Sequence, residues 1–235
     1  MEMGVKYRWF MKNAVNRTKS AVKHASWYLR GRLAQRKYAG FSMIPPDMYA
    51  TNIALLRHLR AARGCVIECG VWRGGMIAGM ADVLGPQREY HLLDSFEGLP
   101  PAQEIDGERA AAYQADPGSP QYFDNCRAEV EYAKRAMSMS RARTKYFHQG
   151  WFADTLPTLQ IPADGIAVLR IDADWYQPTL ECLEALYPQV VAGGLVILDD
   201  YGYWEGTSKA VHRYLAERDL PVTISTEGSV AHIKV

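Results

Sequence analysis

Four aspartates follow two apolar segments in the second half of the chain, and their grouping is the strongest chemical signal in the sequence. Asp172 and Asp174 follow the first segment, and Asp199 and Asp200 follow the second. If these segments are adjacent parallel strands, the four carboxylates meet at one edge of a sheet. Carboxylates held that close repel one another and take up protons unless a cation neutralises them.

A hard divalent cation is the partner that such a group predicts, because oxygen ligands alone favour Mg²⁺, Mn²⁺ or Ca²⁺ over zinc. Asp172, Asp199 and Asp200 can supply three ligands and leave coordination positions for water and a substrate. The alternative is that the four are unrelated loop acids at strand ends. Their convergence on one edge of the predicted sheet favours the metal site.

A glycine-containing turn follows an earlier apolar segment and is a second candidate binding element. Its pattern is E-x-G-x-x-x-G, formed by Glu68, Gly70 and Gly74. Glycines at such a turn let the backbone bend sharply and approach a ligand closely, although glycines also end strands for structural reasons alone. The pattern is neither the G-x-G-x-x-G of dinucleotide-binding folds nor a P-loop, which weakens nicotinamide and nucleoside triphosphate interpretations.

A carboxylate at the end of the next apolar segment is the third candidate. Asp94 lies 26 residues after Glu68, where an acid can accept hydrogen bonds from both ribose hydroxyls of an adenosine. The alternative is an aspartate that caps the following turn, which begins at Ser95. The glycine-containing turn upstream favours the ribose role.

Strand-like and helix-like segments alternate along the body of the chain and predict how these residues are positioned. Most strand-like segments are almost continuously apolar, as central parallel strands covered on both faces are. We expect strands near 65–68, 90–94, 145–147, 165–171, 195–198, 222–225 and 230–233, and helices near 52–62, 76–84, 120–140, 178–190 and 206–218. Residues 100–120 are expected to form a long loop. The order predicts a doubly wound α/β sheet of about seven strands with a C-terminal antiparallel hairpin.

The composition is that of an ordinary globular protein. The chain has 235 residues, of which 48% are hydrophobic and 23% charged, so extended disorder is excluded. Its four cysteines form no C-x-x-C pair, which argues against a structural zinc site or a disulfide framework and favours a cytoplasmic location. No apolar run reaches the length of a membrane span, and we expect no secretory signal.

Charge is distributed unevenly, with a basic N-terminal segment before an acidic body. Residues 1–40 hold ten Lys or Arg and one acid, Glu2, a net charge of +9; the rest holds 17 basic and 25 acidic side chains, a net charge of −8. We expect residues 1–40 to form a basic amphipathic helical extension and residues 41–235 to form the α/β domain. The apolar residues of the extension, from Tyr7 to Leu29, fall within about a 140° arc of a helix.

Three kinds of partner would suit this extension. An amphipathic helix docks on its own domain or on a sister subunit, or it contacts an anionic membrane surface, here through residues 5–36. The membrane alternative would place a cytoplasmic protein at the inner face of the membrane. Nucleic acid is disfavoured, because the acidic body repels a phosphate backbone and no nucleic-acid-binding motif follows.

The chain from about Met43 to its C-terminus resembles the macrocin O-methyltransferase family. Five segments carry the resemblance in order: 67–75 (IECGVWRGG), 93–100 (LDSFEGLP), 150–157 (GWFADTLP), 169–176 (LRIDADWY) and 193–202 (GGLVILDDYG). The resemblance implies a Rossmann-like class I methyltransferase fold. It also implies enzymes that depend on S-adenosylmethionine and Mg²⁺ and methylate sugar hydroxyls of antibiotics.

The resemblance further implies a role for each candidate residue. The metal ligands of the family correspond to Asp172, Asp199 and Asp200, and its proposed general base corresponds to Asp174. The residues that would contact the cofactor are Met43, Glu68, Gly70, Gly74, Gly75, Asp94, Ser95, Gly150, Trp151 and Asp172.

The expected activity is therefore metal-dependent O-methylation of a sugar hydroxyl. The acceptor would be a small glycoside, a natural product or a surface glycan, because the basic extension and the C-terminal hairpin depart from the family pattern. Family analogy also implies a homo-oligomer. Two other classes stay open: a catechol- or phenol-type O-methyltransferase on the same scaffold, and a non-catalytic module that binds cofactor or membrane.

Overall fold

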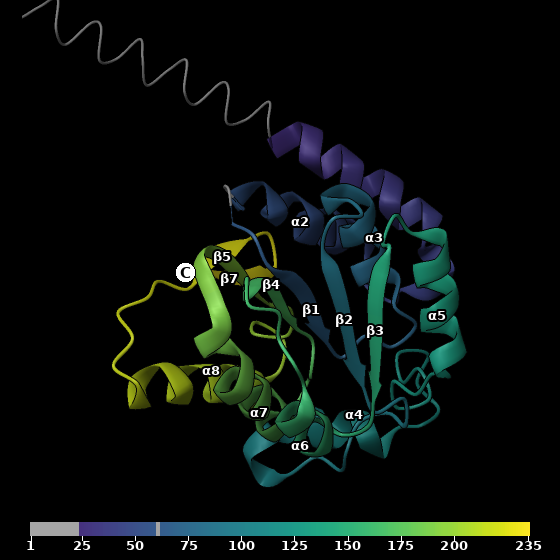
Figure 1. The fold of residues 1–235 in the computed structure, drawn as a ribbon. Helices are drawn as coiled ribbons and strands as arrows, with labels where there is room; N and C mark the ends of the chain where they lie inside the picture. Colours follow the sequence, from purple (N-terminus) through teal and green to yellow (C-terminus); the bar gives the residue numbers. More distant parts are fainter. Residues whose placement is uncertain (1–23, 60–61) are drawn as a thin grey trace, which may run out of the picture.

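One seven-stranded sheet forms the centre of the protein in the computed structural model, which describes residues 24–59 and 62–235. The strand order is β3-β2-β1-β4-β5-β7-β6 (Figure 1). β1 to β5 are parallel, and β7 is antiparallel to both β5 and β6. The strands are β1 (Cys65–Cys69), β2 (Glu89–Asp94), β3 (Thr144–Gln149), β4 (Ile166–Ile171), β5 (Val190–Leu198), β6 (Ser225–Glu227) and β7 (Val230–Lys234).

This topology confirms the predicted doubly wound sheet and its C-terminal hairpin. The strand order reverses between β1 and β4, and the carboxyl ends of these two strands frame the point where such folds bind ligands. The hairpin is shifted from its expected position, because β6 begins at Ser225 rather than near residue 222. The turn between β6 and β7 consists of Gly228 and Ser229.

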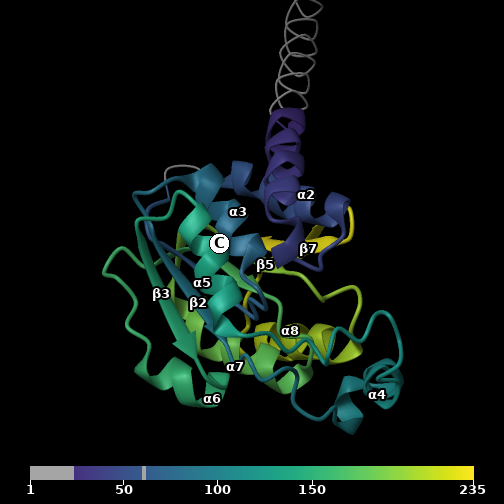
Figure 2. The same ribbon diagram turned by 90° about the vertical axis from the view of Figure 1, so that its right-hand side faces the viewer.

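Helices cover both faces of the sheet. Successive side chains of the buried parallel strands point to opposite faces, and both faces must be covered. One layer contains α2 (Pro46–Leu55), α3 (Gly75–Leu84) and α5 (Val130–Met139), and the other contains α6 (Phe152–Thr155), α7 (Tyr176–Leu186) and α8 (Glu205–Glu217) (Figure 2). Short 3₁₀ helices connect these elements: η1 (Ala39–Phe41), η2 (Leu56–His58), η3 (Glu104–Asp106), η4 (Leu156–Thr158) and η5 (Tyr187–Gln189). Side chains from β1 alternate between the two cores, with Val66 in the first and Ile67 in the second.

Three expected elements differ in the structure. The expected loop at 100–120 contains η3 and a further helix, α4 (Glu108–Ala115). The helix expected at 120–140 begins only at Val130, because four consecutive residues, 123–126, adopt left-handed backbone angles. Asn125 stabilises this turn by donating a hydrogen bond to the Leu99 carbonyl at 2.8 Å. The helix expected at 52–62 begins earlier, at Pro46, where proline suits the first helical turn.

The described part of the N-terminal extension is helical over residues 24–37 and packs on the α/β domain. Ala34 and Tyr38 are buried in the core that contains α2 and α3. Tyr38 donates a hydrogen bond to Asp82 of α3 at 3.0 Å, and the Lys37 ammonium is 2.7 Å from the same carboxylate. The face turned away from this core carries Leu29 and Leu33, which are 59% and 56% exposed.

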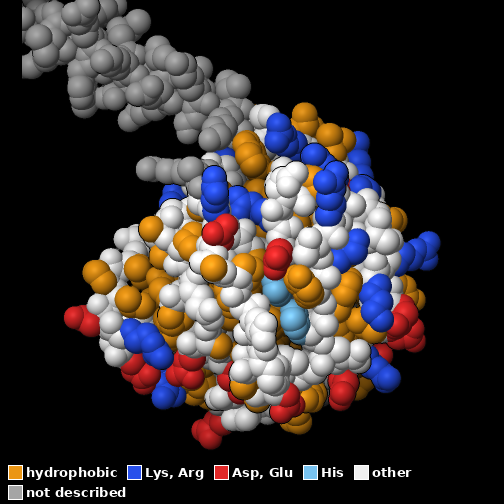
Figure 3. Space-filling model, viewed as in Figure 1, with side chains coloured by type: hydrophobic (Ala, Val, Ile, Leu, Met, Phe, Trp, Pro, Cys, Tyr) orange, Lys and Arg blue, Asp and Glu red, His pale blue; other side chains and the backbone are white. Residues whose placement is uncertain are grey.

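Most of the predicted apolar stripe, including Tyr7, lies outside the described residues. Membrane contact through residues 5–36, homo-oligomer formation and the domain boundary at residue 40 therefore stay predictions. Within residues 24–59 and 62–235, no helix is both long and apolar enough to cross a membrane. Figure 3 shows many basic side chains around the helix that begins at residue 24, and acidic ones along the opposite rim.

Candidate active site

A cavity of about 1010 Å³ opens at the carboxyl ends of the strands, and it collects most of the predicted site residues. The strand ends contribute because each parallel strand delivers its last side chains to the same edge of the sheet. The predicted residues that line the cavity are Met43, Glu68, Gly70, Asp94, Ser95, Trp151, Asp172, Asp174, Asp199 and Asp200. The residues predicted from six separate segments of the sequence thus share one space.

Asp172, Asp199 and Asp200 form the acid cluster that the sequence predicts. One carboxylate oxygen of each lies within 4.8 Å of those of the other two. Each carboxylate also uses a single oxygen for protein contacts: Asp172 Oδ2 and Asp199 Oδ1 face Arg170, and Asp200 Oδ2 accepts from the Asp174 backbone. Within the part of the chain that the structure describes, the second oxygen of each aspartate accepts no hydrogen bond.

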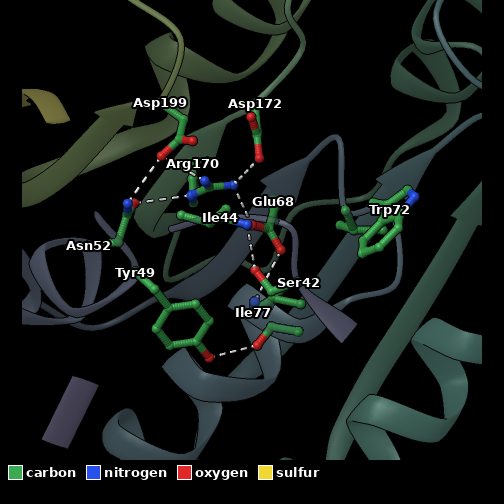
Figure 4. A network of polar contacts seen from close by, with 12 residues as sticks. Ser42, Ile44, Tyr49, Asn52, Glu68, Trp72, Ile77, Arg170, Asp172 and Asp199 are labelled. Atoms are coloured by element: carbon green, nitrogen blue, oxygen red, sulfur yellow. Dashed lines mark hydrogen bonds and ion pairs between the residues drawn. The ribbon is translucent and has the colours of Figure 1, made fainter. Parts of the chain in front are cut away.

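Arg170 neutralises part of this negative charge, a role that the sequence analysis missed. Its side chain is fully buried in β4. Its guanidinium nitrogens lie 2.6 Å from Glu68 Oε1, 2.7 Å from Asp172 Oδ2 and 2.7 Å from Asp199 Oδ1 (Figure 4). The signal was present in the sequence, because Arg170 is the one charged residue in the apolar segment 165–171. One guanidinium faces three carboxylates, so the network keeps an excess of negative charge.

Burial and neighbouring charges raise the pKa values of Asp199 and Asp200. Burial raises the pKa of Asp199 to about 6, although the guanidinium of Arg170 opposes the shift. Burial, followed by the charges of Asp174 and Asp172, also raises the pKa of Asp200. Each of these groups would be ionised more readily beside a positive charge. The free oxygens and the raised pKa values therefore fit a hard divalent cation, whose preferred ligands are carboxylate oxygens.

Asp174 stands next to this cluster in a constrained conformation. Its backbone is left-handed, with a φ of 57°, which is uncommon for a residue other than glycine. Its backbone N–H donates to Asp200 Oδ2 at 3.1 Å, and its carbonyl accepts from the Thr207 hydroxyl at 2.7 Å. Burial, followed by the charge of Asp172, raises the pKa of Asp174 to about 7.

The glycine-containing turn begins where β1 meets the cavity. Gly70 has a φ of +81°, and an added Cβ would lie 1.7 Å from the Asp172 carbonyl oxygen. Glycine is therefore required at position 70, where the chain leaves β1 and passes against the end of β4. The closeness of Gly70 to Asp172 also joins the turn to the acid cluster.

Asp94 holds the same turn from the end of β2. Its Oδ2 accepts hydrogen bonds from the backbone N–H groups of Val71 and Trp72, both at 2.8 Å, and its Oδ1 accepts from Phe96 at 2.7 Å. The bond from Phe96 is the turn-capping contact that the sequence offered as the alternative to the ribose role, whereas the contacts with Val71 and Trp72 were not predicted. Oδ1 accepts only one of these bonds, so it retains a lone pair that a ribose hydroxyl could use.

Glu68 is similarly committed to the protein. Its Oε2 accepts from the Ile77 backbone in the first turn of α3 at 3.1 Å, and its Oε1 pairs with Arg170. Burial raises the pKa of Glu68, against the opposing charge of Arg170. The fixed carboxylate joins α3 to the acid cluster through one buried network, which also includes Asn52 of α2 at 3.0 Å from Asp199. Neither Asn52 nor this link was predicted from the sequence.

Three predicted cofactor residues do not line the cavity. An added Cβ on Gly74 would lie 3.0 Å from the Cα of Ala133 in α5, and one on Gly75 would lie 2.5 Å from the Phe41 carbonyl oxygen. Gly150 donates its backbone N–H to the Asp94 carbonyl at 3.0 Å. These glycines let neighbouring backbone segments pack closely behind the cavity wall. Their predicted contact with a cofactor stays a prediction.

The comparison with known families decides where the chain belongs. The family described as macrocin-O-methyltransferase (TylF) matches residues 13–230, nearly the whole chain. The chain belongs to this family. Its membership confirms the resemblance carried by the five sequence segments.

Members of the macrocin O-methyltransferase family with assigned activities resemble this chain over most of its length. Demethyldecarbamoylnovobiocin O-methyltransferase of Streptomyces niveus is 36% identical over 172 residues, which cover 70% of this chain and 64% of that enzyme. Mycinamicin III 3''-O-methyltransferase of Micromonospora griseorubida is 32% identical over 163 residues, which cover 64% of this chain and 60% of that enzyme. The chain thus spans less than two thirds of the length of these relatives.

Solved structures agree with the fold described above. The O-methyltransferase NovP is 32% identical, with a TM-score of 0.58 over 74% of this chain and 72% of that one. The calicheamicin methyltransferase CalS11 is 21% identical, with a TM-score of 0.59 over 86% of this chain and 90% of that one. Both likenesses support the class I methyltransferase fold that the five segments predicted.

Proposed function

We propose that this chain transfers the methyl group of S-adenosylmethionine to a sugar hydroxyl, with the help of a hard divalent cation such as Mg²⁺. The observation that carries the proposal is the arrangement at the ends of β4 and β5. Within residues 24–59 and 62–235, Asp172, Asp199 and Asp200 each keep one carboxylate oxygen free of hydrogen bonds, and they line the same cavity as Asp174 and Gly70. The activities named for the relatives, such as 3''-O-methylation of mycinamicin III, support the acceptor class.

The turn after β1 and the end of β2 would hold the cofactor. Gly70 permits close approach of the backbone, and Asp94 fixes that backbone while keeping a lone pair on Oδ1. Ser95 and Trp151 also line the cavity, and each follows the carboxyl end of one of the paired strands β2 and β3. S-adenosylmethionine supplies a methyl group that its sulfonium already activates. The chief task of the protein is therefore to hold the acceptor oxygen, the methyl group and the sulfur in line.

The acid cluster would hold the cation through Asp172, Asp199 and Asp200. A divalent cation there supplies a positive charge that favours loss of a proton from a nearby hydroxyl. Arg170 orients two of the three carboxylates and leaves their second oxygens free. The contacts with Arg170 would thus hold the carboxylates of Asp172 and Asp199 in place before a cation binds.

Asp174 would accept the proton from the acceptor hydroxyl. It lines the cavity next to the cluster, yet its backbone N–H rather than its carboxylate contacts Asp200. Its carboxylate is not among the oxygens of Asp172, Asp199 and Asp200 that lie within 4.8 Å of one another. A pKa of about 7 suits a group that must be ionised before it can act as a base near neutral pH.

Methyl transfer to a glycoside probe tests the proposal. The purified full-length chain is incubated with S-adenosylmethionine labelled in the methyl group and with demethyldecarbamoylnovobiocin, the substrate named for one relative. We expect labelled product in MgCl₂ and at least a tenfold lower rate in EDTA that excess Mg²⁺ restores. Product that forms equally in EDTA would contradict the metal requirement, and labelling of a catechol but of no sugar would contradict the acceptor class.

A further inference from the structure

Trp204 donates the hydrogen bond that fixes the side chain of the proposed base. It is the residue before α8 and is 6% exposed. Its indole Nε1–H donates to Asp174 Oδ1 at 2.7 Å, a short distance typical of a bond to a charged acceptor. Within the described residues, the other oxygen, Asp174 Oδ2, accepts no hydrogen bond. One oxygen is therefore anchored and the other is available in the cavity.

The backbone of Asp174 is fixed independently of that contact. Asp200 and Thr207 bond its N–H and its carbonyl, and its left-handed φ restricts it further. The remaining freedom lies in the rotation of the carboxylate about the side-chain bonds. The bond from Trp204 removes that freedom, because moving Oδ1 would leave a buried indole N–H without an acceptor.

Trp204 is itself held by a cluster of aromatic rings. The ring centroids of Trp175 and Tyr113 lie 4.9 Å and 5.7 Å from that of Trp204, in edge-to-face arrangements at 76° and 71°. Ala110 of α4 completes the buried part of this cluster. Packing from several sides fixes the direction of the indole N–H, and edge-to-face contacts of this kind are favourable.

The segment that carries Tyr113 is fastened to the same edge of the sheet. Asp106, which is buried, accepts from the Tyr176 backbone at the start of α7 at 2.7 Å and from Gln103 at 2.8 Å. Lys209 of α8 donates to the Ile105 carbonyl at 2.9 Å. The residues around η3 and α4 thus bridge α7 and α8, and the ring of Tyr113 is delivered to Trp204 from a fixed support.

We propose that Trp204 is a positioning residue that orients Asp174 so that Oδ2 faces the acceptor hydroxyl, and that η3 and α4 keep Trp204 in place. The inference rests on the proposed function, because it assumes that Asp174 acts as the base. A merely structural Trp204 would fill space between α4 and α8, and its N–H would have no consequence for the reaction. The two roles predict different reaction rates for a variant that loses the indole N–H of Trp204 but keeps an aromatic ring.

The contact itself is tested by NMR on protein labelled with ¹⁵N at tryptophan. The chain has six tryptophans, and Trp204→Phe identifies the Trp204 indole signal by its loss. We expect that signal to move upfield in Asp174→Asn, because a carboxamide oxygen is a weaker acceptor than a carboxylate. Trp175 is the matched control, since its Nε1 donates to the Pro100 carbonyl at 2.9 Å and should not respond. A Trp204 signal that stays in place in Asp174→Asn overturns the proposal.

The consequence is tested by steady-state kinetics of Trp204→Phe with demethyldecarbamoylnovobiocin as acceptor. We expect kcat to fall by about 10- to 100-fold, the loss that follows from a misplaced catalytic group. The KM for S-adenosylmethionine and the Kd of S-adenosylhomocysteine should change by less than about threefold. Trp175→Phe removes an N–H from the same cluster and should lower kcat less. Equal losses in the two variants, or a weakened Kd in Trp204→Phe, would assign Trp204 to packing alone.

The two arms separate this inference from the proposed function. If the Trp204 signal shifts in Asp174→Asn but the wild-type chain forms no methylated product, the proposed reaction or acceptor is contradicted, while the contact stands. An active wild-type chain whose kcat is unaffected by Trp204→Phe overturns the positioning role and leaves the methyltransferase proposal intact.

Discussion

Each metal-candidate aspartate in this chain divides its two oxygens between the protein and the cavity. Arg170 contacts one oxygen of Asp172 and one of Asp199, and the backbone N–H of Asp174 donates to one oxygen of Asp200. This arrangement explains how acids that would repel one another can be packed together before a cation binds. It also separates Asp174, whose carboxylate accepts a hydrogen bond from an indole, from the three residues whose carboxylates converge.

Replacing Asp174 with asparagine tests this separation. We expect Asp174→Asn to bind S-adenosylhomocysteine and Mn²⁺ like the wild type, while methyl transfer falls by about 10²- to 10⁴-fold, the usual contribution of a general base. Calorimetric titration measures binding, and the labelled-product assay measures the rate. Loss of Mn²⁺ binding in this variant would instead place Asp174 among the metal ligands.

Replacing Arg170 with methionine tests the buried network. The change leaves Glu68 and two aspartates without their cation, and breaking such a buried pair costs about 3 to 5 kcal/mol of the free energy of unfolding. Urea unfolding at pH 7 measures the loss. The matched control is Arg213→Met, because the pair of Arg213 with Glu217 is about half exposed and should contribute much less to stability. Similar losses in both variants would contradict the central role of Arg170.

At the scale of elements, the turn from β1 into α3 joins the two halves of the site. Gly70 passes against the end of β4, Asp94 holds the turn from β2, and Glu68 holds the start of α3. The site is therefore assembled from the ends of strands that are adjacent in space but separated in sequence by up to about a hundred residues.

Gly70→Ala tests the role of this turn. A Cβ at φ +81° is strained, and here it would meet the Asp172 carbonyl, so the backbones of β1 and β4 must separate. We expect the affinity for S-adenosylhomocysteine to fall at least tenfold and the melting temperature to drop. Gly40→Ala is the control, because nothing lies within 4 Å of the added Cβ. Unchanged affinity in Gly70→Ala would show that the cofactor does not depend on this turn.

The sequence predicted the central strands and the acids at their ends, because continuous apolar runs and topology determine both. It did not predict α4, because the Asp, Gly and Pro residues spread through 100–120 are typical of a loop. It extended α5 too far towards the N-terminus, because a tertiary hydrogen bond from Asn125 stabilises left-handed backbone angles there. The ion pairs of Arg170 and the hydrogen bond from Trp204 likewise depend on tertiary structure, which the hydrophobic periodicity of the sequence does not encode.

At the scale of the whole molecule, ion pairs join segments that are far apart in the chain. Arg57 of η2 contacts both oxygens of Glu227 in β6, and this pair fastens the C-terminal hairpin to the helical layer that contains α2. Burial acts to raise the pKa of Glu227, but the hydrogen bonds and the charge of Arg57 outweigh it and hold that pKa below its usual range.

The sign of this shift predicts how stability depends on pH. A carboxylate with a depressed pKa in the folded state stabilises that state above its unfolded pKa of about 4.3, and the contribution is lost as the pH falls through the lower folded value. We expect Glu227→Gln to lower the free energy of unfolding by about 1 kcal/mol at pH 7, with the difference vanishing near pH 3. Glu131→Gln, in an exposed pair with Lys134, should show little effect at either pH. A pH-independent loss in Glu227→Gln would contradict the ion pair.

Calorimetric titration of S-adenosylhomocysteine into the 235-residue chain is the decisive experiment, because the proposed roles of Gly70, Asp94 and Asp174 all depend on that cofactor class. We expect one site per chain with micromolar affinity in MgCl₂ and retained binding in EDTA, because the proposed cation site is the acid cluster rather than the glycine-containing turn. We also expect that Gly70→Ala weakens binding while Asp174→Asn does not. The absence of binding in both MgCl₂ and EDTA would contradict the methyltransferase assignment and leave the acid cluster without its proposed reaction.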